Sequence, residues 1–538
     1  MDEPVDMTAE TSVAAVLAEA LARSGLRRAF GIPGGGTSAF VVELAARGVP
    51  FVLTHGETSA AIMAATEAER SGTPGAVFTS NGPGAAAVMG GIAHAKLDRA
   101  ALLVVTDRQP SAANRDGYHQ WLDQTALFRG VAKASFTLTA EDTASTVEHA
   151  LRIARSDPPG PVHLDVPAGL ARMVSSEPMI PPSPHTQRHP EVPGTITHKV
   201  RGARRPLILA GLGSRDLMAG RLQTVAEGLR APVLTTYKGK GAIDETSPWA
   251  AGIVTGGAVE RRLLEEADLV ISVGLDAIEL FASMPGMRER VALDAYLPLP
   301  GPLTPPTHEV LGDLDHLVAG LPRDGASTWR VEEIVSFRRE VESRLAAAQT
   351  EGPGVHPWAL ARALSDTFAE EADIAVDAGA HMLPLAQAWR TRRPGSFSIS
   401  NGLATMGFGL PAAIARSLAD PERRVVCCTG DGGLLMVAGE LATAARHAHR
   451  LTIVVFDDRS LSLIRVKQSE VELGHAVGIP GPDWSTVAQG FGIPSVDVAD
   501  VAQLEVALRA ARTATTPTMI VVATDPTPYG AIIEVLRG

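Results

Sequence analysis

The sequence predicts an α/β protein of three domains with parallel sheets, in which two related domains flank a third. Two stretches, 78–107 and 428–458, share one layout: a buried strand, a Gly-rich turn, a helix, and a second strand that ends in Val-Val-x-Asp. In such a unit both strands lie parallel in one sheet. A further block of strands and helices separates the two copies, and 538 residues suffice for about three to four domains of ordinary size.

The first block, 1–175, alternates helices and strands. Apolar and small residues recur at helical spacing in some segments, and short β-branched runs between Gly, Pro and Asn residues mark the strands. We expect helices over 11–24, 57–70 and 85–96, strands over 28–31, 51–54, 76–79, 101–106 and 160–167, and sharp turns at 33–36 and 80–84.

Two further blocks follow a linker. Residues 171–196 contain Pro178 and then a run of polar residues and further prolines, which is typical of a linker. In the second block, 190–325, we expect strands at 206–210, 232–236 and 268–273, a Gly-rich turn at 211–214 and a Pro-rich tract at 298–306. In the third block, 350–538, we expect strands at 424–428 and 451–456 and a helix over 434–447.

Composition excludes several classes of function. The net charge of −12 and the lack of a basic cluster argue against a nucleic-acid or anionic-membrane partner. Cys427 and Cys428 are adjacent inside a predicted buried strand, so they do not form a disulfide framework. The N-terminus is acidic and lacks an apolar signal segment, and no uncharged apolar run reaches about 18 residues. We therefore expect a soluble, cytoplasmic protein.

The turn at 430–433, Gly-Asp-Gly-Gly, is the strongest local signal. The amides of Gly432 and Gly433 and the positive end of the following helix attract phosphate oxygens. Asp431 and Asp458 stand at the carboxyl ends of two neighbouring strands, where their hard oxygen atoms can meet on one Mg²⁺ ion. The alternative is an ordinary tight turn with a surface pair of aspartates.

The spacing of these residues resembles the thiamine diphosphate (ThDP) motif of the acetolactate synthase-like family, in which Gly-Asp-Gly is followed by Asn-Asn. Here 24 residues separate Gly432 from Asp457. The resemblance covers nearly the whole chain, with further matches at 30–36, 54–61, 80–85, 160–167, 235–244 and 401–415. It implies a pyrimidine-binding domain at 1–175, a Rossmann-like central domain at 190–325 and a diphosphate-binding domain at 350–538.

The resemblance also implies the cofactor contacts. ThDP stabilises a carbanion, and for this the family uses one Glu, here Glu57, hydrogen-bonded to N1′ of the pyrimidine. The residue at Met406 wedges the cofactor into a bent shape, and the carbonyl of Ala404, where the family has Gly, accepts from the 4′-amino group. The further cofactor-binding residues implied are Pro33, Gly34, Gly82, His381, Thr405, Gly430, Gly432, Gly433, Leu463 and Ile464.

Some of these residues have plainer alternatives. Glu57 could be an ordinary acidic residue in the first turn of a helix, stabilised by the helix dipole. Met406 could be a buried residue where a loop joins a helix, and His381 could simply be packed in the core. The sequence leaves these alternatives open.

The metal site departs from the family, because Asp457-Asp458 replaces Asn-Asn. Asp431 and Asp458 would be side-chain ligands of Mg²⁺, with the carbonyl of Ser460 as a third ligand. Asp is as good an oxygen ligand as Asn. The extra negative charge near a diphosphate should make the site more dependent on the divalent ion, so we expect chelation to inactivate the enzyme.

The segment that lines the substrate site in the family also differs. His119 replaces the Phe typical of acetolactate synthase, whereas Gln120 keeps the usual Gln. An imidazole near the cofactor could shuttle protons or bind a carboxylate. Lys467 stands where acetolactate synthase has Trp, and with Arg465 it indicates an anionic substrate. The alternative for all of these is a solvated or peripheral position.

The implied function is ThDP- and Mg²⁺-dependent decarboxylation of a pyruvate-like 2-oxo acid, with transfer of the product to a second carbonyl. The alternatives are a simple non-oxidative decarboxylase and a flavin-linked oxidase. FAD is not expected, because the Arg-rich continuation of FAD-binding members is missing after Val273. Gly211-x-Gly213 lacks the full nicotinamide-binding pattern. In the family Glu57 faces the 430–433 turn across subunits, so a homodimer or homotetramer with interfacial active sites is expected.

Overall fold

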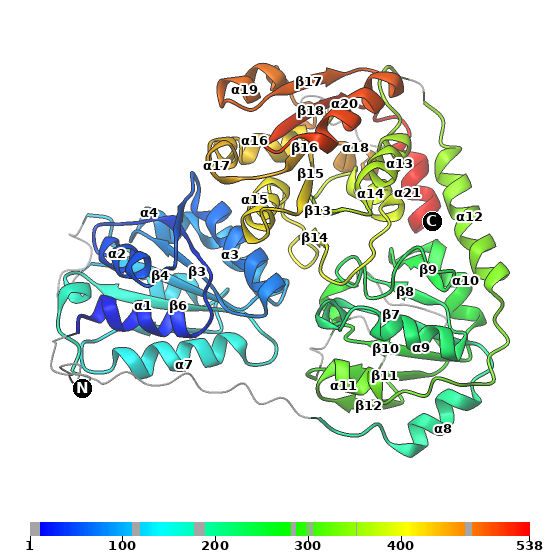
Figure 1. Ribbon diagram of the computed structural model, residues 1–538, viewed down its shortest axis with the longest axis horizontal. Helices are drawn as coiled ribbons and strands as arrows, with labels where there is room; N and C mark the ends of the chain where they lie inside the picture. The colour runs from blue at the N-terminus through cyan, green and yellow to red at the C-terminus, as the bar shows by residue number, and fades with distance from the viewer. Residues whose placement is uncertain are drawn as a thin grey trace, which may run out of the picture. The chain divides into compact units, whose positions relative to one another are not determined.

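The computed structural model comprises two compact units, Met1–Thr186 and Gln187–Gly538, which contain three sheets of six strands each (Figure 1). It describes residues 11–109, 119–176, 189–280, 287–297, 301, 305–350, 352–468 and 476–538. Every pairing between the strands of these sheets is parallel. This confirms the predicted class, three α/β domains with parallel sheets.

The first unit contains a sheet with the strand order β2-β1-β3-β4-β6-β5. Its strands are β1 (Ala29–Ile32), β2 (Phe51–Leu53), β3 (Gly75–Thr79), β4 (Leu102–Arg108), β5 (Ala134–Thr137) and β6 (Pro161–Pro167). Its helices are α1 (Val13–Arg23), α2 (Ser38–Ala46), α3 (Glu57–Ser71), α4 (Pro83–Ala87), α5 (Met89–Leu97), α6 (Gln124–Phe128) and α7 (Thr143–Arg155), with a 3-10 turn at η2 (Leu170–Arg172).

Helices pack against this first sheet. Side chains on alternate strand positions, such as Phe78, Leu103 and Leu164, point to one side and are fully buried against α1, α2 and α7. The small residues Ala61 and Ala64 of α3 are also fully buried, and α3 packs against β1, β3 and α5. A site can therefore form where the strands end and the loops begin.

The central sheet of the second unit has the strand order β12-β11-β10-β7-β8-β9, which is the order of a Rossmann-like fold. Its strands are β7 (Pro206–Ala210), β8 (Val233–Thr235), β9 (Ala250–Ile253), β10 (Leu269–Val273), β11 (Arg290–Asp294) and β12 (His308–Leu311). Its helices are α8 (Gly194–Gly202), α9 (Arg221–Leu229), α10 (Ala258–Glu266), α11 (Leu314–Ala319) and the connecting α12 (Val331–Ala346), with 3-10 turns at η3 (Leu212–Asp216) and η4 (Ala277–Glu279).

The third sheet has the strand order β14-β13-β15-β16-β18-β17. Its strands are β13 (Ala372–Val376), β14 (Phe397–Ile399), β15 (Arg424–Gly430), β16 (Leu451–Asp457), β17 (Ser495–Val498) and β18 (Thr518–Ala523). Its helices are α13 (Pro357–Phe368), α14 (Met382–Ala388), α15 (Gly409–Ala419), α16 (Asp431–Met436), α17 (Glu440–His447), α18 (Ser462–Lys467), α19 (Trp484–Gly490), α20 (Val501–Thr513) and α21 (Tyr529–Arg537).

The first and third sheets have the same topology. When the strands of each sheet are counted in chain order, both sheets read 2-1-3-4-6-5. The predicted repeat of 78–107 and 428–458 corresponds to β3–β4 and β15–β16, which are adjacent parallel pairs with helices between them. The structure thus confirms the repeat at the level of whole domains.

The helix of each repeat is broken in two, and here the sequence-based expectation was wrong. The helix expected over 85–96 is α4 and α5, which meet at Val88, and the one expected over 434–447 is α16 and α17. Val437 has φ −133°, outside the helical region, and ends α16. In addition, α16 begins at Asp431, so the two glycines lie within its first turn and not before it.

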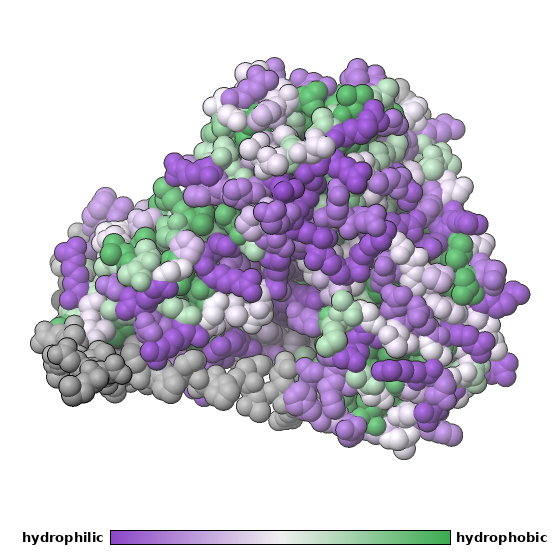
Figure 2. Space-filling view, viewed as in Figure 1, coloured by the Kyte–Doolittle hydropathy of each residue, from purple (hydrophilic) through white to green (hydrophobic). Residues whose placement is uncertain are grey.

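Hydrophilic side chains cover most of the face shown in Figure 2, where apolar residues form small separate groups. Among the described helices, none combines the length and the apolar character needed to cross a bilayer. Cys427 and Cys428 are both free and fully buried in β15, as expected from the lack of a disulfide framework.

Candidate functional site

In the first unit, the loops that follow four neighbouring strands meet at one edge of the sheet. The strands β2, β1, β3 and β4 are adjacent in that order. Glu57 follows β2, Pro33 and Gly34 follow β1, and Gly82 follows β3. Asp107 lies at the carboxyl end of β4. Sites of α/β proteins form at this edge, so the structure brings the predicted residues of the first unit together.

Glu57 is the first residue of α3 and directly follows the loop after β2. Its side chain is half-buried, whereas residues 59–68 of the same helix are buried. A Cβ added to Gly84 would lie 3.4 Å from Oε1 of Glu57, so the carboxylate reaches the turn after β3. The helix beyond Glu57 is therefore buried, whereas within this unit the side chain of Glu57 itself is only partly enclosed.

Asp107, which the sequence did not mark as a site residue, fixes the turn after β1. Its Oδ2 accepts a hydrogen bond from the amide of Gly36 at 3.1 Å. A Cβ on Gly34 would lie only 2.1 Å from the same oxygen, so the turn requires Gly at this position. Burial raises the pKa of Asp107 to about 6, against the opposing hydrogen bonds from the amides of Gly36 and Thr37.

A buried glutamine holds the turn after β3. The Oε1 atom of Gln124 accepts from the amide of Gly82 at 3.2 Å. Its Nε2 atom donates to Oδ1 of Asp165 at 2.6 Å, to Oγ1 of Thr106 at 3.0 Å and to the carbonyl of Asp107 at 2.9 Å. Gln124 therefore couples a predicted cofactor-binding residue to β4 and β6. Sequence reasoning missed it, because an isolated Gln is usually exposed.

His119 and Gln120 lie beside the same turn. Gln120 has φ 61°, which is uncommon for a residue other than Gly, and its carbonyl accepts a weak hydrogen bond from Nδ2 of Asn81 at 3.5 Å. The carbonyl of His119 accepts from Nε2 of Gln109 at 3.3 Å. Both residues are exposed within this unit. The backbone at Gln120 thus adjoins the cofactor turn, and the roles of the two side chains stay predictions.

In the second unit, Asp431 and Asp458 provide two interacting carboxylates where β15 and β16 end. Asp431 is only 2% exposed. Burial, and then the charge of Asp458, raises the pKa of Asp431 to about 7. Burial also raises the pKa of Asp458 to about 6, and the charge of Asp457 adds to this effect. Like charges held together in a buried place are stabilised by a bound cation.

The donor atoms of this pair fit Mg²⁺. The Oδ2 atom of Asp431 is buried and has no hydrogen-bond partner among the described residues, whereas its Oδ1 accepts from the amide of Gly432 at 2.6 Å. The Oδ1 atom of Asp458 accepts a hydrogen bond from the amide of Ser460 at 3.0 Å. This bond orients the loop that carries Asp458 and Ser460. An unsatisfied carboxylate oxygen is costly to bury, so Asp431 is suited to a ligand that supplies positive charge.

Few other side chains are available to complete such a site. Within the described ranges no group of three or more His, Cys, Asp or Glu side chains is arranged to hold a metal ion. Ser460 forms an isolated antiparallel bridge with Gly478. A Mg²⁺ ion at this place would therefore need backbone and phosphate oxygens besides the two carboxylates, which is its usual mode of binding in phosphate sites.

The turn between β15 and α16 carries the first amides of a helix, of which that of Gly432 donates to Oδ1 of Asp431. Gly430 caps α16, and Gly432 and Gly433 lie in its first turn, where amides lack partners within a helix. His381 lies against this turn, since a Cβ on Gly430 would be 3.4 Å from its ring. Burial lowers the pKa of His381 to about 4, so the imidazole is neutral near pH 7 and packs 5.2 Å from the ring of Phe456.

The segment 404–406 lies next to the same turn. Ala404 has φ 52°, in the left-handed region that costs a residue with a Cβ about 1 kcal/mol. Gly, which the family has at this position, would not carry this cost. Ala404 is therefore held with backbone strain. Thr405 is held by a hydrogen bond from its amide to Oγ of Ser400 at 3.2 Å. The methyl group of Met406 would be 3.4 Å from a Cβ on Gly432, which brings the proposed wedge to the diphosphate turn.

The helix that follows the metal loop, α18, carries the last predicted residues. Leu463 is half-buried, whereas Ile464, Arg465 and Lys467 are exposed. The charge of Arg465 acts on the carboxylate of Asp458, so this end of the helix is electrostatically connected to the metal pair. Exposure of Lys467 agrees with both expectations, an anion-binding residue and a solvated face.

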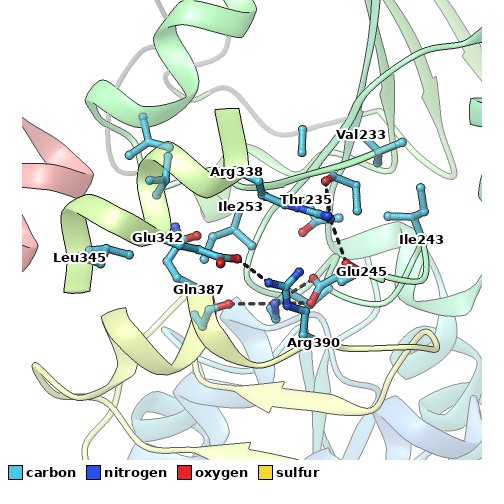
Figure 3. A pocket seen from close by; sticks show the side chains of 17 residues that line it. Val233, Thr235, Ile243, Glu245, Ile253, Arg338, Glu342, Leu345, Gln387 and Arg390 are labelled. Carbon is cyan, nitrogen blue, oxygen red and sulfur yellow. Dashed lines mark hydrogen bonds and ion pairs between the residues drawn. The ribbon is translucent and has the colours of Figure 1, made fainter. Parts of the chain in front are cut away.

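A small cavity of the second unit lies between β8, β9, α12 and α14 (Figure 3). Its volume is about 40 Å³, which holds water and not an organic substrate. Its charged side chains pair with one another: Lys240 donates to both oxygens of Glu245 at 2.8 and 2.7 Å, and Arg390 is bonded to Glu342. We interpret this cluster as a contact that joins the central and third sheets, and not as a substrate site.

Comparison with protein families matches all three domains. Residues 11–127 match the thiamine pyrophosphate enzyme N-terminal TPP binding domain, where thiamine pyrophosphate (TPP) is another name for ThDP. Residues 195–289 match the central domain of the same enzymes, and residues 377–522 match their C-terminal TPP binding domain. The matches follow the order of the three sheets along the chain.

Several curated relatives are similar to this chain over most of their length. The acetolactate synthase large subunit of Parasynechococcus marenigrum is 31% identical, over 95% of this chain and 87% of the relative. The probable acetolactate synthase large subunit of Methanococcus aeolicus is 28% identical, over 92% and 89%. The probable 2-ketoarginine decarboxylase AruI of Pseudomonas aeruginosa is 30% identical, over 92% and 90%.

Proposed function

We propose a function for this chain on the basis of its family. The chain belongs to the thiamine pyrophosphate enzyme family and is an acetolactate synthase-like enzyme with carboligase or decarboxylase activity. The enzyme binds ThDP together with Mg²⁺, decarboxylates a 2-oxo acid such as pyruvate and transfers the product to a second carbonyl compound. The observation that carries this proposal is the interacting pair of the buried Asp431 and the half-buried Asp458 beside the glycine turn of α16.

The residues divide into two groups by the part of the cofactor they would contact. Asp431, Asp458 and the carbonyl of Ser460 would hold Mg²⁺, and the amides of the 430–433 turn would bind the diphosphate. Glu57 would hold a proton at N1′ of the pyrimidine, with the carbonyl of Ala404 and the side chain of Met406 orienting the same ring. When bound, ThDP supplies the electron sink for loss of CO₂ from the substrate.

Further parts of the proposal concern the substrate and the assembly. His119 and Gln120 would steer the substrate, and Arg465 and Lys467 would attract its carboxylate. Their exposure within each unit supports a site completed by another part of the assembly, and we propose a cytoplasmic homodimer or homotetramer without FAD. The domain boundaries proposed are 1–175, 190–325 and 350–538.

A second candidate function is simple decarboxylation, in which the intermediate is protonated and released as an aldehyde. A relative named as a probable 2-ketoarginine decarboxylase, 30% identical over 92% of the chain, favours this possibility. Both candidates require the same loss of CO₂, so they differ only in what the product contains.

The test is incubation of the full chain with ThDP, Mg²⁺ and a panel of 2-oxo acids, followed by measurement of CO₂ and mass spectrometry of the products. Transfer predicts a product that contains carbon from two substrates, whereas simple decarboxylation predicts an aldehyde one carbon shorter than the substrate. The control is the same protein after removal of ThDP. Absence of CO₂ release from every 2-oxo acid, with ThDP bound, would refute both candidates.

A further inference from the structure

Asp377 is a fully buried carboxylate at a junction of the third sheet. It directly follows β13, and its side chain is 0% exposed. Oδ1 accepts from the amides of Ala378 at 2.8 Å and Phe408 at 3.1 Å. Oδ2 accepts from the amide of Gly407 at 3.2 Å and from the hydroxyl of Thr429 at 2.9 Å. Two oxygen atoms thus satisfy four donors from three separate segments.

Three of these donors belong to, or directly adjoin, the two segments that would bind the two ends of ThDP. Gly407 directly follows Met406, which would contact the pyrimidine end. Thr429 directly precedes Gly430, where the diphosphate turn begins. The carboxylate also lies against the turn itself, because a Cβ on Gly433 would be 2.5 Å from Oδ2 of Asp377.

The backbone of Asp377 holds a third cofactor-related residue. Its carbonyl is hydrogen-bonded to the ring of His381, and its amide donates to the carbonyl of Cys428 at 2.8 Å. His381 in turn lies against Gly430. One residue therefore connects the imidazole, β15 and the 404–408 segment.

A purely structural role is the alternative, and the same strand offers a residue for comparison. Asp373, at the amino end of β13, is 3% exposed and forms ion pairs with Arg393, Arg416 and Arg423. It stabilises the opposite end of the sheet, away from the loops that would bind the cofactor. Asp377 differs because its partners are the amides and hydroxyl of the cofactor segments.

We propose that Asp377 is a positioning residue that sets the separation between the 404–408 segment and the 430–433 turn, so that both ends of one ThDP molecule are bound at once. This inference rests on the proposed roles of those two segments. The replacement Asp377→Asn preserves the shape but turns one oxygen into an NH₂ group. If Oδ1 keeps its partners, this NH₂ group faces the N–H of Gly407, which then has no acceptor.

The test compares two ligands in the full chain with saturating Mg²⁺, using calorimetry. ThDP requires both segments, whereas inorganic pyrophosphate requires only the metal and the turn. We expect Asp377→Asn to weaken ThDP binding about 10- to 100-fold and pyrophosphate binding less than about 3-fold, since supporting hydrogen bonds to a site carry effects of this size. Asp373→Asn, the matched control, should lower thermal stability without changing the ratio of the two affinities.

The outcomes separate the inference from the proposed function. Equal weakening of both ligands in Asp377→Asn would overturn the positioning role, whatever the wild-type protein catalyses. Binding of ThDP without turnover of any 2-oxo acid would count against the proposed function and leave the comparison of ligands valid. If Asp377→Asn does not fold, Thr429→Val, which removes one donor to Oδ2, should weaken ThDP about 3- to 10-fold more than pyrophosphate; an unchanged ratio would overturn the inference.

Discussion

Replacing Asp431 with Asn is expected to stabilise the metal-free protein while weakening its metal site, which loses one negative charge. Asp431 is 2% exposed, and its Oδ2 has no hydrogen-bond partner among the described residues. Without a cation, the ionised carboxylate is buried beside the charge of Asp458. An Asn side chain keeps the shape and removes the charge, so the folded state loses an unfavourable interaction.

The magnitude and its pH dependence follow from the raised pKa of Asp431, about 7 against an ordinary value of 3.8. The folded protein binds this proton more tightly than the unfolded chain, so the free energy of unfolding falls as pH rises from about 4 to about 7 and then levels off. Each tenfold change in proton affinity corresponds to about 1.4 kcal/mol, which limits the loss to about 4 kcal/mol. We expect Asp431→Asn to recover about 2 to 4 kcal/mol above pH 7 and almost nothing near pH 4.

Urea unfolding of both proteins in the presence of a chelator, followed by circular dichroism, measures this difference at several pH values. The control is Asp457→Asn, which changes a half-buried neighbour that lies 3.7 Å from Arg459. With ThDP and Mg²⁺ present, the order should reverse, because the wild-type protein binds the cation more tightly and gains more stability from the ligands. A variant that is less stable than the wild type at pH 8 in chelator, or a difference that does not vary with pH, would refute the reasoning.

Three further predictions concern the same site. Exhaustive chelation should abolish activity, since the Asp458 carboxylate adds negative charge near the diphosphate; a verified metal-free preparation with full activity would contradict this. Glu57→Gln should abolish turnover and leave ThDP bound, as measured by calorimetry and CO₂ release; full activity would refute the role of the carboxylate. Ala404→Gly should retain activity and raise the free energy of unfolding by up to about 1 kcal/mol, because φ 52° strains any residue with a Cβ; lower stability in urea unfolding would show that the strain is absent.

The sequence was sufficient for the three-domain architecture and for the strands that form short apolar runs between turn residues, whereas edge strands such as β5, β9 and β17 were not predicted. The layout shared by 78–107 and 428–458 predicted a repeat, and the identical strand order of the first and third sheets bears it out. The breaks at Val88 and Val437 were not predictable in the same way. The apolar spacing continues across both positions, so this spacing alone does not mark where each helix ends.

Within the candidate site, sequence reasoning found residues whose position follows from strand topology. Asp431 and Asp458 had to approach each other, because they follow adjacent parallel strands. Asp377 follows an apolar strand in the same way and could have been singled out as a buried carboxylate. Gln124 could not have been singled out from the sequence, because its contact with Gly82 depends on where α6 lies in the folded protein.

The two copies of the shared topology use their strand-end carboxylates differently. Asp107 and Asp457 occupy the same place, at the Val-Val-x-Asp ends of β4 and β16. Asp107 accepts a hydrogen bond from the amide of Gly36 and so stabilises the turn after β1. In the second copy, Asp458 follows directly and adds a carboxylate that interacts with Asp431. Among the described residues the repeated geometry is therefore suited to a cation in the third sheet. We expect one bound ion per chain, retained in Asp107→Asn and lost in Asp458→Ala.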